Sequence, residues 1–334
     1  MRPLLRRLLL FALTTPTTQQ PQRYGVYVQS DSRAPSEVAP AKRNESWWWA
    51  SAALTARQAA RHGDRYVHYR VPPTGCVAAD GLTELTAPWC KVRAMLQAMD
   101  DFPGAAVFLY LDSDAAVSPA YANRSLVALG DFVAARTPGF GDESRPVALS
   151  RDGHGHWCVT LWKRRKLLPH HWDACLNAGV IIWRRDVLGR ARDFFERWWA
   201  LAATCCDHFP DAHRVWPWEQ TGLQYVAADG KDVAAAVPVY EPDYPAARHL
   251  VWPPKIRYKE CPVPWCLSHL PGACCVVDHH CAGRRDKFAL AARALRERAT
   301  RAPASAALRL VDRRVNATEA TLRGRGARTG MIDH

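Results

Sequence analysis

The sequence has no run of about 20 apolar residues, which is the length that a membrane-spanning helix needs. The nearest candidate is the apolar run 8–13, which follows Arg2, Arg6 and Arg7. This run is short even for the apolar core of a signal peptide. We therefore expect residues 1–22 to be a truncated signal or signal-anchor segment with a tether, so that the N-terminus is at most a membrane tether.

No CxxC motif occurs, so a zinc ribbon or a thioredoxin-like redox site has no support. The 11 cysteines instead include two vicinal pairs, Cys205–Cys206 and Cys274–Cys275. Such a count favours an oxidising compartment and several disulfides. Three glycosylation sequons, at Asn44, Asn123 and Asn316, fit a glycoprotein of the Golgi or ER lumen.

The formal net charge of +13 raises the possibility of a nucleic-acid partner, but the charge is concentrated near the C-terminus. Residues 284–334 contain 13 Lys or Arg and 5 Asp or Glu. A basic tail of this kind is more often solvated than bound in a groove. We expect no nucleic acid, and we interpret residues 301–334 as a basic, flexible tail.

Between residues 23 and 300, predicted strands alternate with predicted helices. We expect strands at 23–30, 66–71, 107–111, 146–150 and 176–183, and helices at 47–61, 89–100, 125–136, 187–205, 216–228 and 287–301. Residues 72–88 are expected to be a loop. This alternation predicts an α/β fold with a mostly parallel sheet flanked by helices, in a single domain.

The central stretch is the apolar run 107–111, which leads directly into Asp112, Ser113 and Asp114. The run predicts a buried strand, and ligands of open α/β sheets bind beyond the carboxyl ends of such strands. If the backbone stays extended, the two carboxylates point the same way. They would then suit Mg²⁺ or Mn²⁺ and a substrate diphosphate. The alternative is a solvated turn.

Further short motifs occur in a fixed order along the chain. They are Arg61-His-Gly63, Trp89-Cys-Lys91, Leu111-Asp-Ser-Asp114, Asn177-Ala-Gly-Val180, Glu219-Gln220 and His280-Cys-Ala-Gly283. This set resembles the GT-A (Rossmann-like) nucleotide-sugar glycosyltransferases. It is most similar to the glycosyltransferase family 34-like galactosyl-, mannosyl- and xylosyltransferases. The resemblance spans roughly residues 24–287 and implies a metal-dependent transferase that retains the anomeric configuration.

The resemblance also implies roles for individual residues. Asp112, Asp114 and His280 would bind the metal, for which a shell of carboxylate and imidazole favours Mn²⁺ over Mg²⁺. Asp278 and His279 leave the identity of the late ligand open. The nucleotide-diphosphate sugar would be bound by the same acidic motif and by other residues, namely Lys91, Ser113, Asn177, Ala178, Gly179, Gly283 and Lys287. Simple structural roles, such as a surface lysine or a strand kink, remain alternatives for these.

Glu219 and Gln220 are the candidate catalytic residues. The family usually has Asp-Gln here, so Glu219 is longer by one methylene. A double displacement would use Glu219 as the nucleophile, whereas a front-face reaction would need only the support of Gln220. A helix N-terminal carboxylate is the structural alternative.

Other classes of protein are weighed against this interpretation. A HAD-type phosphohydrolase also has Asp-x-Asp after a buried strand, but it usually has a hydroxyl residue where Ala116 stands. A nucleotidyltransferase would usually show an early Gly-rich phosphate loop, which is missing. A non-catalytic lumenal sugar-binding protein of the same fold is the third alternative. We favour transfer of a hexose or pentose to a glycan or glycoprotein acceptor.

Overall fold

The computed structural model describes residues 23–117, 121–135, 140, 146–151, 176–186, 188–204, 218–229, 266–269, 275–279 and 312–314. The largest sheet of this part has six strands in the order β11-β2-β1-β5-β8-β7. Their bounds are Asp312–Arg314 (β11), Arg65–Arg70 (β2), Gly25–Asp31 (β1), Val107–Leu111 (β5), Leu176–Arg184 (β8) and Val147–Arg151 (β7).

Parallel pairs outnumber antiparallel pairs in this sheet, which confirms the predicted α/β class. The strands β11, β2, β1 and β5 pair in parallel, while β8 runs antiparallel to both β5 and β7. Every residue of β5 is buried, as expected of a central strand covered on both faces.

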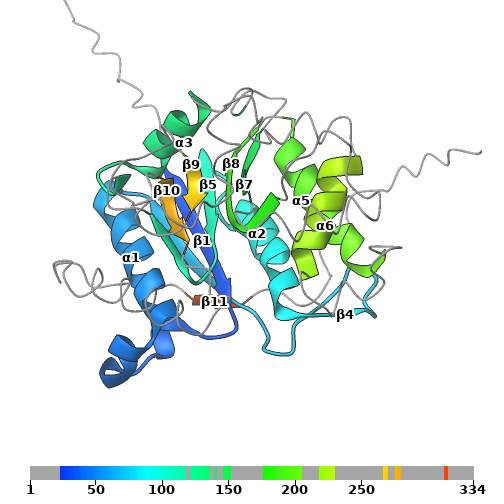
Figure 1. Ribbon diagram of the computed structural model, residues 1–334, viewed down its shortest axis with the longest axis horizontal. Helices are drawn as coiled ribbons and strands as arrows, with labels where there is room; N and C mark the ends of the chain where they lie inside the picture. The colour runs from blue at the N-terminus through cyan, green and yellow to red at the C-terminus, as the bar shows by residue number, and fades with distance from the viewer. Residues whose placement is uncertain are drawn as a thin grey trace, which may run out of the picture.

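Helices cover both faces of the sheet (Figure 1). One face packs against α1 (Trp47–His62) and α3 (Leu126–Ala134), and the other against α2 (Cys90–Asp101), α5 (Arg190–Thr204) and α6 (Trp218–Asp229). Side chains alternate along β5 between the two cores, with Phe108 and Tyr110 on the α2 side and Leu109 and Leu111 on the α1 side. The sheet therefore separates two apolar cores.

The described residues also form a second, three-stranded sheet. It has the order β6-β10-β9, with bounds Ala115–Val117 (β6), Cys275–His279 (β10) and Cys266–His269 (β9). Because β6 begins four residues after β5 ends, the chain changes sheets at the Asp-Ser-Asp motif. The late strand β10 pairs antiparallel with β6, so distant parts of the sequence meet beside this motif.

The predicted loop 72–88 is wrong in detail, because it contains a hairpin of β3 (Cys76–Val77) and β4 (Glu84–Leu85) and a 3-10 helix, η3 (Ala87–Trp89). A disulfide joins Cys76 to Cys90, with the two Cα atoms 5.7 Å apart. Each strand of the hairpin has only two residues, and the segment is rich in Pro and Gly and without periodicity, so it carries no strand signal.

Within the predicted tail 301–334, the structure describes residues 312–314, which form β11 at the edge of the main sheet. The expected helix 287–301 and residues 1–22 lie outside the described residues. Among the helices that the structure describes, none has both the length and the apolarity needed to cross a bilayer.

Candidate functional site

The Asp-Ser-Asp motif forms a tight turn rather than an extended strand end. The amide of Ala115 donates to the carbonyl oxygen of Asp112 at 2.9 Å, which closes a four-residue turn. The backbone does not stay extended here, because the chain turns into the second sheet, so the condition for aligning the two carboxylates is not met. Ser51 of α1 also donates to the Ala115 carbonyl at 2.5 Å, which ties the turn to α1.

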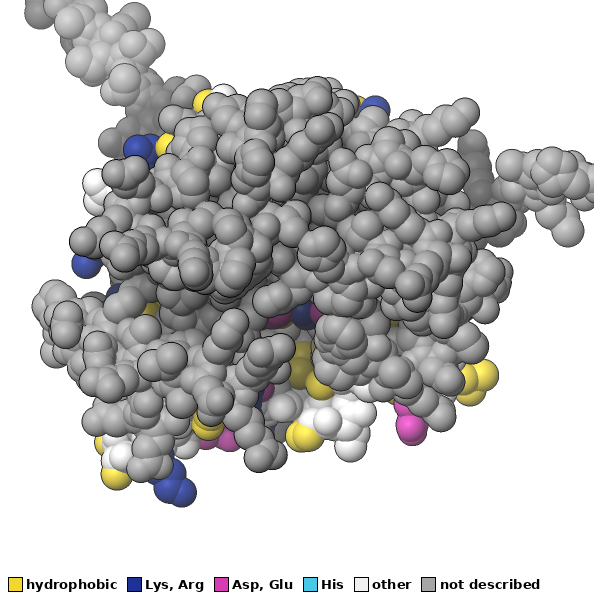
Figure 2. Space-filling view, viewed as in Figure 1, with side chains coloured by type: hydrophobic (Ala, Val, Ile, Leu, Met, Phe, Trp, Pro, Cys, Tyr) yellow, Lys and Arg dark blue, Asp and Glu magenta, His cyan; other side chains and the backbone are white. Residues whose placement is uncertain are grey.

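Lys91 lies between two carboxylates that come from different elements. Its Nζ is 2.9 Å from Asp112 Oδ1, at the end of β5, and 2.8 Å from Glu219 Oε1, in the first turn of α6. Lys91 and Glu219 are 7% exposed, whereas Asp112 is 29% exposed. The cluster is thus buried on the helix side and open at Asp112. Basic and acidic side chains come into view together near the centre of the face in Figure 2.

Burial and charge act against each other in this cluster. Burial alone would lower the pKa of Lys91, but Asp112 and Glu219 outweigh it and hold that pKa well above its usual range. Burial raises the pKa of the Glu219 carboxyl, and the adjacent Lys91 reduces this effect without cancelling it. Lys91 therefore carries a fixed positive charge at neutral pH.

Lys91 and Glu219 each lie in the first turn of a helix, but the helix dipole favours only the Glu219 carboxylate there. The positive end of the α6 dipole favours the Glu219 carboxylate, but the first turn of α2 disfavours the Lys91 ammonium. Lysine is also among the residues that are least often buried. A lysine kept there against local preference indicates a functional constraint.

Three contacts fix α6 so that Glu219 reaches Lys91. Gln224 pairs with both backbone groups of Leu176 on β8, at 3.1 and 2.9 Å. Trp198 of α5 donates to the Glu219 carbonyl at 2.9 Å. Gly222 lies so close to Trp89 that an added Cβ would be 2.5 Å from its ring. This close approach explains why glycine stands within α6 despite its low helix propensity.

The predicted Asn177-Ala178-Gly179 segment adjoins the cluster through its backbone. The Asp112 amide donates to the Gly179 carbonyl at 2.8 Å, and Lys91 Nζ is 3.4 Å from the Ala178 carbonyl. The pairing of β7 with β8 shifts between Leu149 and Ser150, because Leu149 pairs with Ile181 and Ser150 with Asn177. The pairing of β8 with β7 is therefore irregular at this segment, which lies beside the site.

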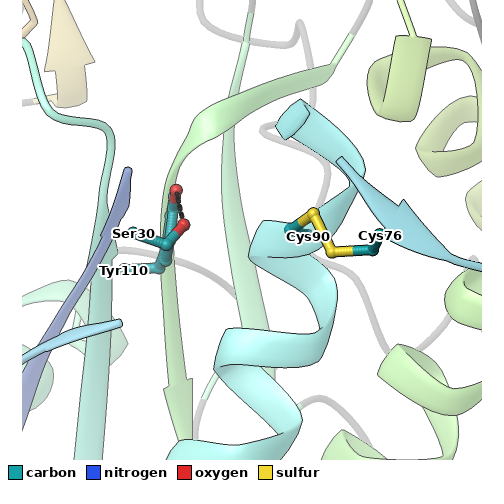
Figure 3. The surroundings of a disulfide bond; sticks show 4 residues. All are labelled: Ser30, Cys76, Cys90 and Tyr110. Carbon is teal, nitrogen blue, oxygen red and sulfur yellow. Dashed lines mark hydrogen bonds between the residues drawn. A yellow bond between two sulfur atoms is a disulfide. The ribbon is translucent and has the colours of Figure 1, made fainter. Parts of the chain in front are cut away.

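The start of α2 is held by the disulfide, since Cys90 directly precedes Lys91 (Figure 3). Cys90 is fully buried, and the bond ties it to the β3–β4 hairpin. The hairpin thereby anchors the helix turn that carries Lys91.

The structure describes two of the three expected metal ligands, Asp112 and Asp114. Lys91 and Tyr110 both donate to Asp112 Oδ1, and none of the described residues donates to Oδ2. Asp114 follows in the same turn and is partly exposed. The backbone of His279 pairs with Ala115, so β10 ends beside the motif, but His280 itself lies outside the described residues. No cluster of three metal-binding side chains occurs among the residues that were described.

Sequence reasoning missed Tyr110 and Asp31. Tyr110 lies two residues before Asp112 and shares its strand face, so the period of two could have indicated it. Asp31 ends β1, the parallel neighbour of β5, and accepts hydrogen bonds from Ser113 and Arg33. Burial would raise the pKa of Asp31, but these donors outweigh it and lower that pKa.

Gln220, Gly283 and Lys287 are the remaining predicted site residues. Gln220 follows Glu219 on α6 and is partly buried, while Gly283 and Lys287 lie outside the described residues.

No family model matches the sequence, and comparison with curated proteins gives no significant match. Among solved structures, the chain is similar to a glycosyltransferase involved in glycosylation of the major capsid of PBCV-1, at 15% identity over 82% of this chain and 99% of the other, with a TM-score of 0.47. It is also similar to the galactosyltransferase LgtC in complex with donor and acceptor sugar analogs, at 15% identity over 83% and 95%, with a TM-score of 0.43.

A third similar structure is the apo form of mouse xyloside xylosyltransferase 1, at 11% identity over 64% of this chain and 84% of the other, with a TM-score of 0.37. All three are glycosyltransferases. Likenesses this distant do not fix the activity of the chain, which must be inferred from its own residues.

Proposed function

We propose that this protein is a metal-dependent glycosyltransferase of the GT-A type, which moves a sugar from a nucleotide-diphosphate sugar to a glycan or glycoprotein acceptor with retention. One observation carries the proposal. A buried Lys91 bridges Asp112 and Glu219, at the end of the sheet where α/β proteins bind their ligands.

The chemistry of the transfer demands such a site. A departing nucleoside diphosphate develops negative charge, and fixed positive charge that is already in place stabilises it. A divalent cation, which Asp112, Asp114 and His280 would hold, would act as a Lewis acid on the diphosphate oxygens. Lys91 offsets part of the negative charge of the carboxylates at the same place and keeps the Asp112 carboxylate oriented. Mn²⁺ is our choice of metal, with Mg²⁺ as the alternative.

Glu219 is proposed to bind the donor sugar. Its Oε1 pairs with Lys91, while its buried Oε2 has no hydrogen-bond partner among the described residues. A buried acceptor without a partner is costly, and a sugar hydroxyl would satisfy it. Formation of a glycosyl ester on Glu219 would remove the charge that pairs with Lys91. This favours a front-face reaction, supported by Gln220, over a double displacement.

We place the protein in the lumen of the Golgi or the ER. A disulfide between Cys76 and Cys90 is stable in an oxidising compartment. Asn123, one of the sequons, is exposed in the turn before α3, where a glycan can be attached. Residues 1–22 are proposed as the tether.

A screen of nucleotide sugars with and without Mn²⁺, read out as nucleotide release, tests the proposal. We expect release of one nucleoside diphosphate that depends on the metal. Phosphate release from a simple ester would instead indicate a phosphohydrolase. Sugar binding without any nucleotide release would indicate a non-catalytic binding protein.

A further inference from the structure

A buried tyrosine of β5 forms a hydrogen bond to the acidic motif. Tyr110 lies on β5, two residues before Asp112, and is 1% exposed. Its phenol donates to Asp112 Oδ1 at 3.1 Å. On the neighbouring strand β1, Ser30 Oγ lies 3.0 Å from the same phenol oxygen. Figure 3 shows the two side chains meeting between adjacent strands.

The direction of these hydrogen bonds follows from counting protons. An ionised carboxylate only accepts, and a phenol has a single proton to donate. A tyrosine phenol ordinarily titrates at about pH 10, so at neutral pH it keeps that proton. Since Tyr110 donates to Asp112, Ser30 must donate to Tyr110. The chain of donation therefore runs from Ser30 through Tyr110 to Asp112.

The consequence for Asp112 concerns its two oxygens. Both described donors, Lys91 Nζ at 2.9 Å and the Tyr110 phenol at 3.1 Å, bind Oδ1. Two donors on one oxygen fix the rotation of the carboxylate about its terminal bond, which is otherwise broad. Oδ2 receives no hydrogen bond from the described residues, and the side chain is 29% exposed.

We propose that Tyr110 is a positioning residue, which turns Asp112 so that Oδ1 faces Lys91 and Oδ2 is presented to the divalent cation. Ser30 holds the phenol in the orientation that this requires. The inference rests on the proposed function, because it assumes a cation at Asp112. It assigns Tyr110 no contact with the substrate.

The test compares Tyr110→Phe with Tyr69→Phe, a matched control. Tyr69 is equally buried, and its phenol donates to Asp101 at 2.7 Å, an interaction that does not involve the acidic motif. Binding of UDP, and separately of GDP, is measured by calorimetry with and without Mn²⁺. We expect Tyr110→Phe to weaken the Mn²⁺-dependent binding by roughly tenfold, the scale of one lost hydrogen bond to a charged group. Tyr69→Phe should bind like the wild type.

Kinetics provides a second readout. At saturating donor, Tyr110→Phe should raise the KM for Mn²⁺ more than it lowers kcat, because the cation site is misaligned but not removed. Should Tyr110→Phe fail to fold, Ser30→Ala leaves the ring in place and is expected to weaken binding by roughly twofold to threefold.

The outcomes separate the two proposals. If the wild type binds the nucleotide with Mn²⁺ and Tyr110→Phe or Ser30→Ala binds equally well, the positioning role is overturned. An equal loss in Tyr69→Phe overturns it too, because the loss would then reflect general destabilisation. If the wild type binds neither nucleotide and releases none from any donor, the proposed function itself fails.

Discussion

Two buried carboxylate environments, one on each face of the main sheet, differ in how completely they are satisfied. On the α1–α3 side, Asp64 accepts the Gly25 amide on one oxygen at 2.8 Å and the Leu126 amide on the other at 2.7 Å. On the α2–α6 side, Glu219 Oε2 has no partner among the described residues, and the described donors to the Asp112 carboxylate all bind Oδ1.

This difference distinguishes a structural carboxylate from one that can bind a ligand. Asp64 joins the start of β1 to the start of α3, and each of its oxygens has a donor, as buried polar groups usually do. In the Asp112–Lys91–Glu219 cluster, Glu219 Oε2 is buried and has no partner among the described residues, which is unfavourable without a ligand. We interpret Asp64 as a structural link, and the cluster as the binding site of the proposed function.

The largest expected effect is on catalysis. Asp114→Asn should reduce nucleotide release by about 100-fold to 1,000-fold, because the negative charge of this carboxylate at the cation site is lost. The side chain is partly exposed, so the thermal midpoint should stay unchanged. Measured turnover and a melting curve check both parts. Normal turnover in this variant would remove the metal from the mechanism.

Removing Lys91 should have the largest effect on stability. Lys91→Met leaves two carboxylates facing each other, and breaking a buried ion pair costs about 3–5 kcal/mol. The double variant Lys91→Met/Glu219→Gln should regain part of this free energy of unfolding, because less unpaired charge remains buried. Denaturant unfolding of both variants measures the difference. A loss well under 1 kcal/mol in the single variant would contradict the buried pairing.

Loss of the disulfide should have the next largest effect on stability. Replacing Cys76 and Cys90 with Ser releases a loop with a sequence separation of 14, which costs about 3 kcal/mol in the chain-entropy account. A dithiol reductant should lower the thermal midpoint of the wild type more than that of the double variant. Equal sensitivity would show that these two cysteines are not paired.

Asp64→Asn should lower stability with little effect on activity, whereas Asp114→Asn should lower activity with little effect on stability. An amide nitrogen would face one of the two backbone donors, so stability should fall by about 1–3 kcal/mol. Nucleotide release by the folded variant should stay within about twofold of the wild type, since the residue lies outside the site. A large loss of kcat without loss of stability would make Asp64 part of the site.

The smallest expected effect is a change in pH dependence. Because burial raises the pKa of Glu219, the carboxylate becomes protonated as the pH falls through a value above that of an ordinary glutamate. Its pairing with Lys91 is lost in that window, and kcat/KM should fall there. Glu219→Gln should have a lower maximal kcat/KM, and the acidic limb of its pH profile should move to lower pH. An unchanged limb would assign it to another group.

Much of the fold could be predicted from local sequence. The apolar runs of β5 and β8 and the alternation of strands with helices are strong periodic signals. Within the described residues, the structure confirms the strands and helices that they predict. The candidate residues Lys91, Asp112 and Glu219 could also be selected from short motifs, and the structure brings them together.

The rest depends on tertiary contacts that no local pattern encodes. Residues 112–115 turn because the chain changes sheets, and the irregularity in β8 arises from its pairing with β7. Lys91 meets Glu219 because Gly222 lets α6 approach Trp89 closely. The role of Tyr110 becomes visible only when the donors to each oxygen of Asp112 are counted.

The most direct test of the binding site is a crystal structure with Mn²⁺ and the nucleoside diphosphate that the screen identifies, in which anomalous scattering locates the metal. The Asp112–Lys91–Glu219 geometry predicts an anomalous peak bonded to Asp112 and Asp114, with the diphosphate beside Lys91. A metal and nucleotide bound elsewhere, with the cluster unchanged and far from both, would contradict it.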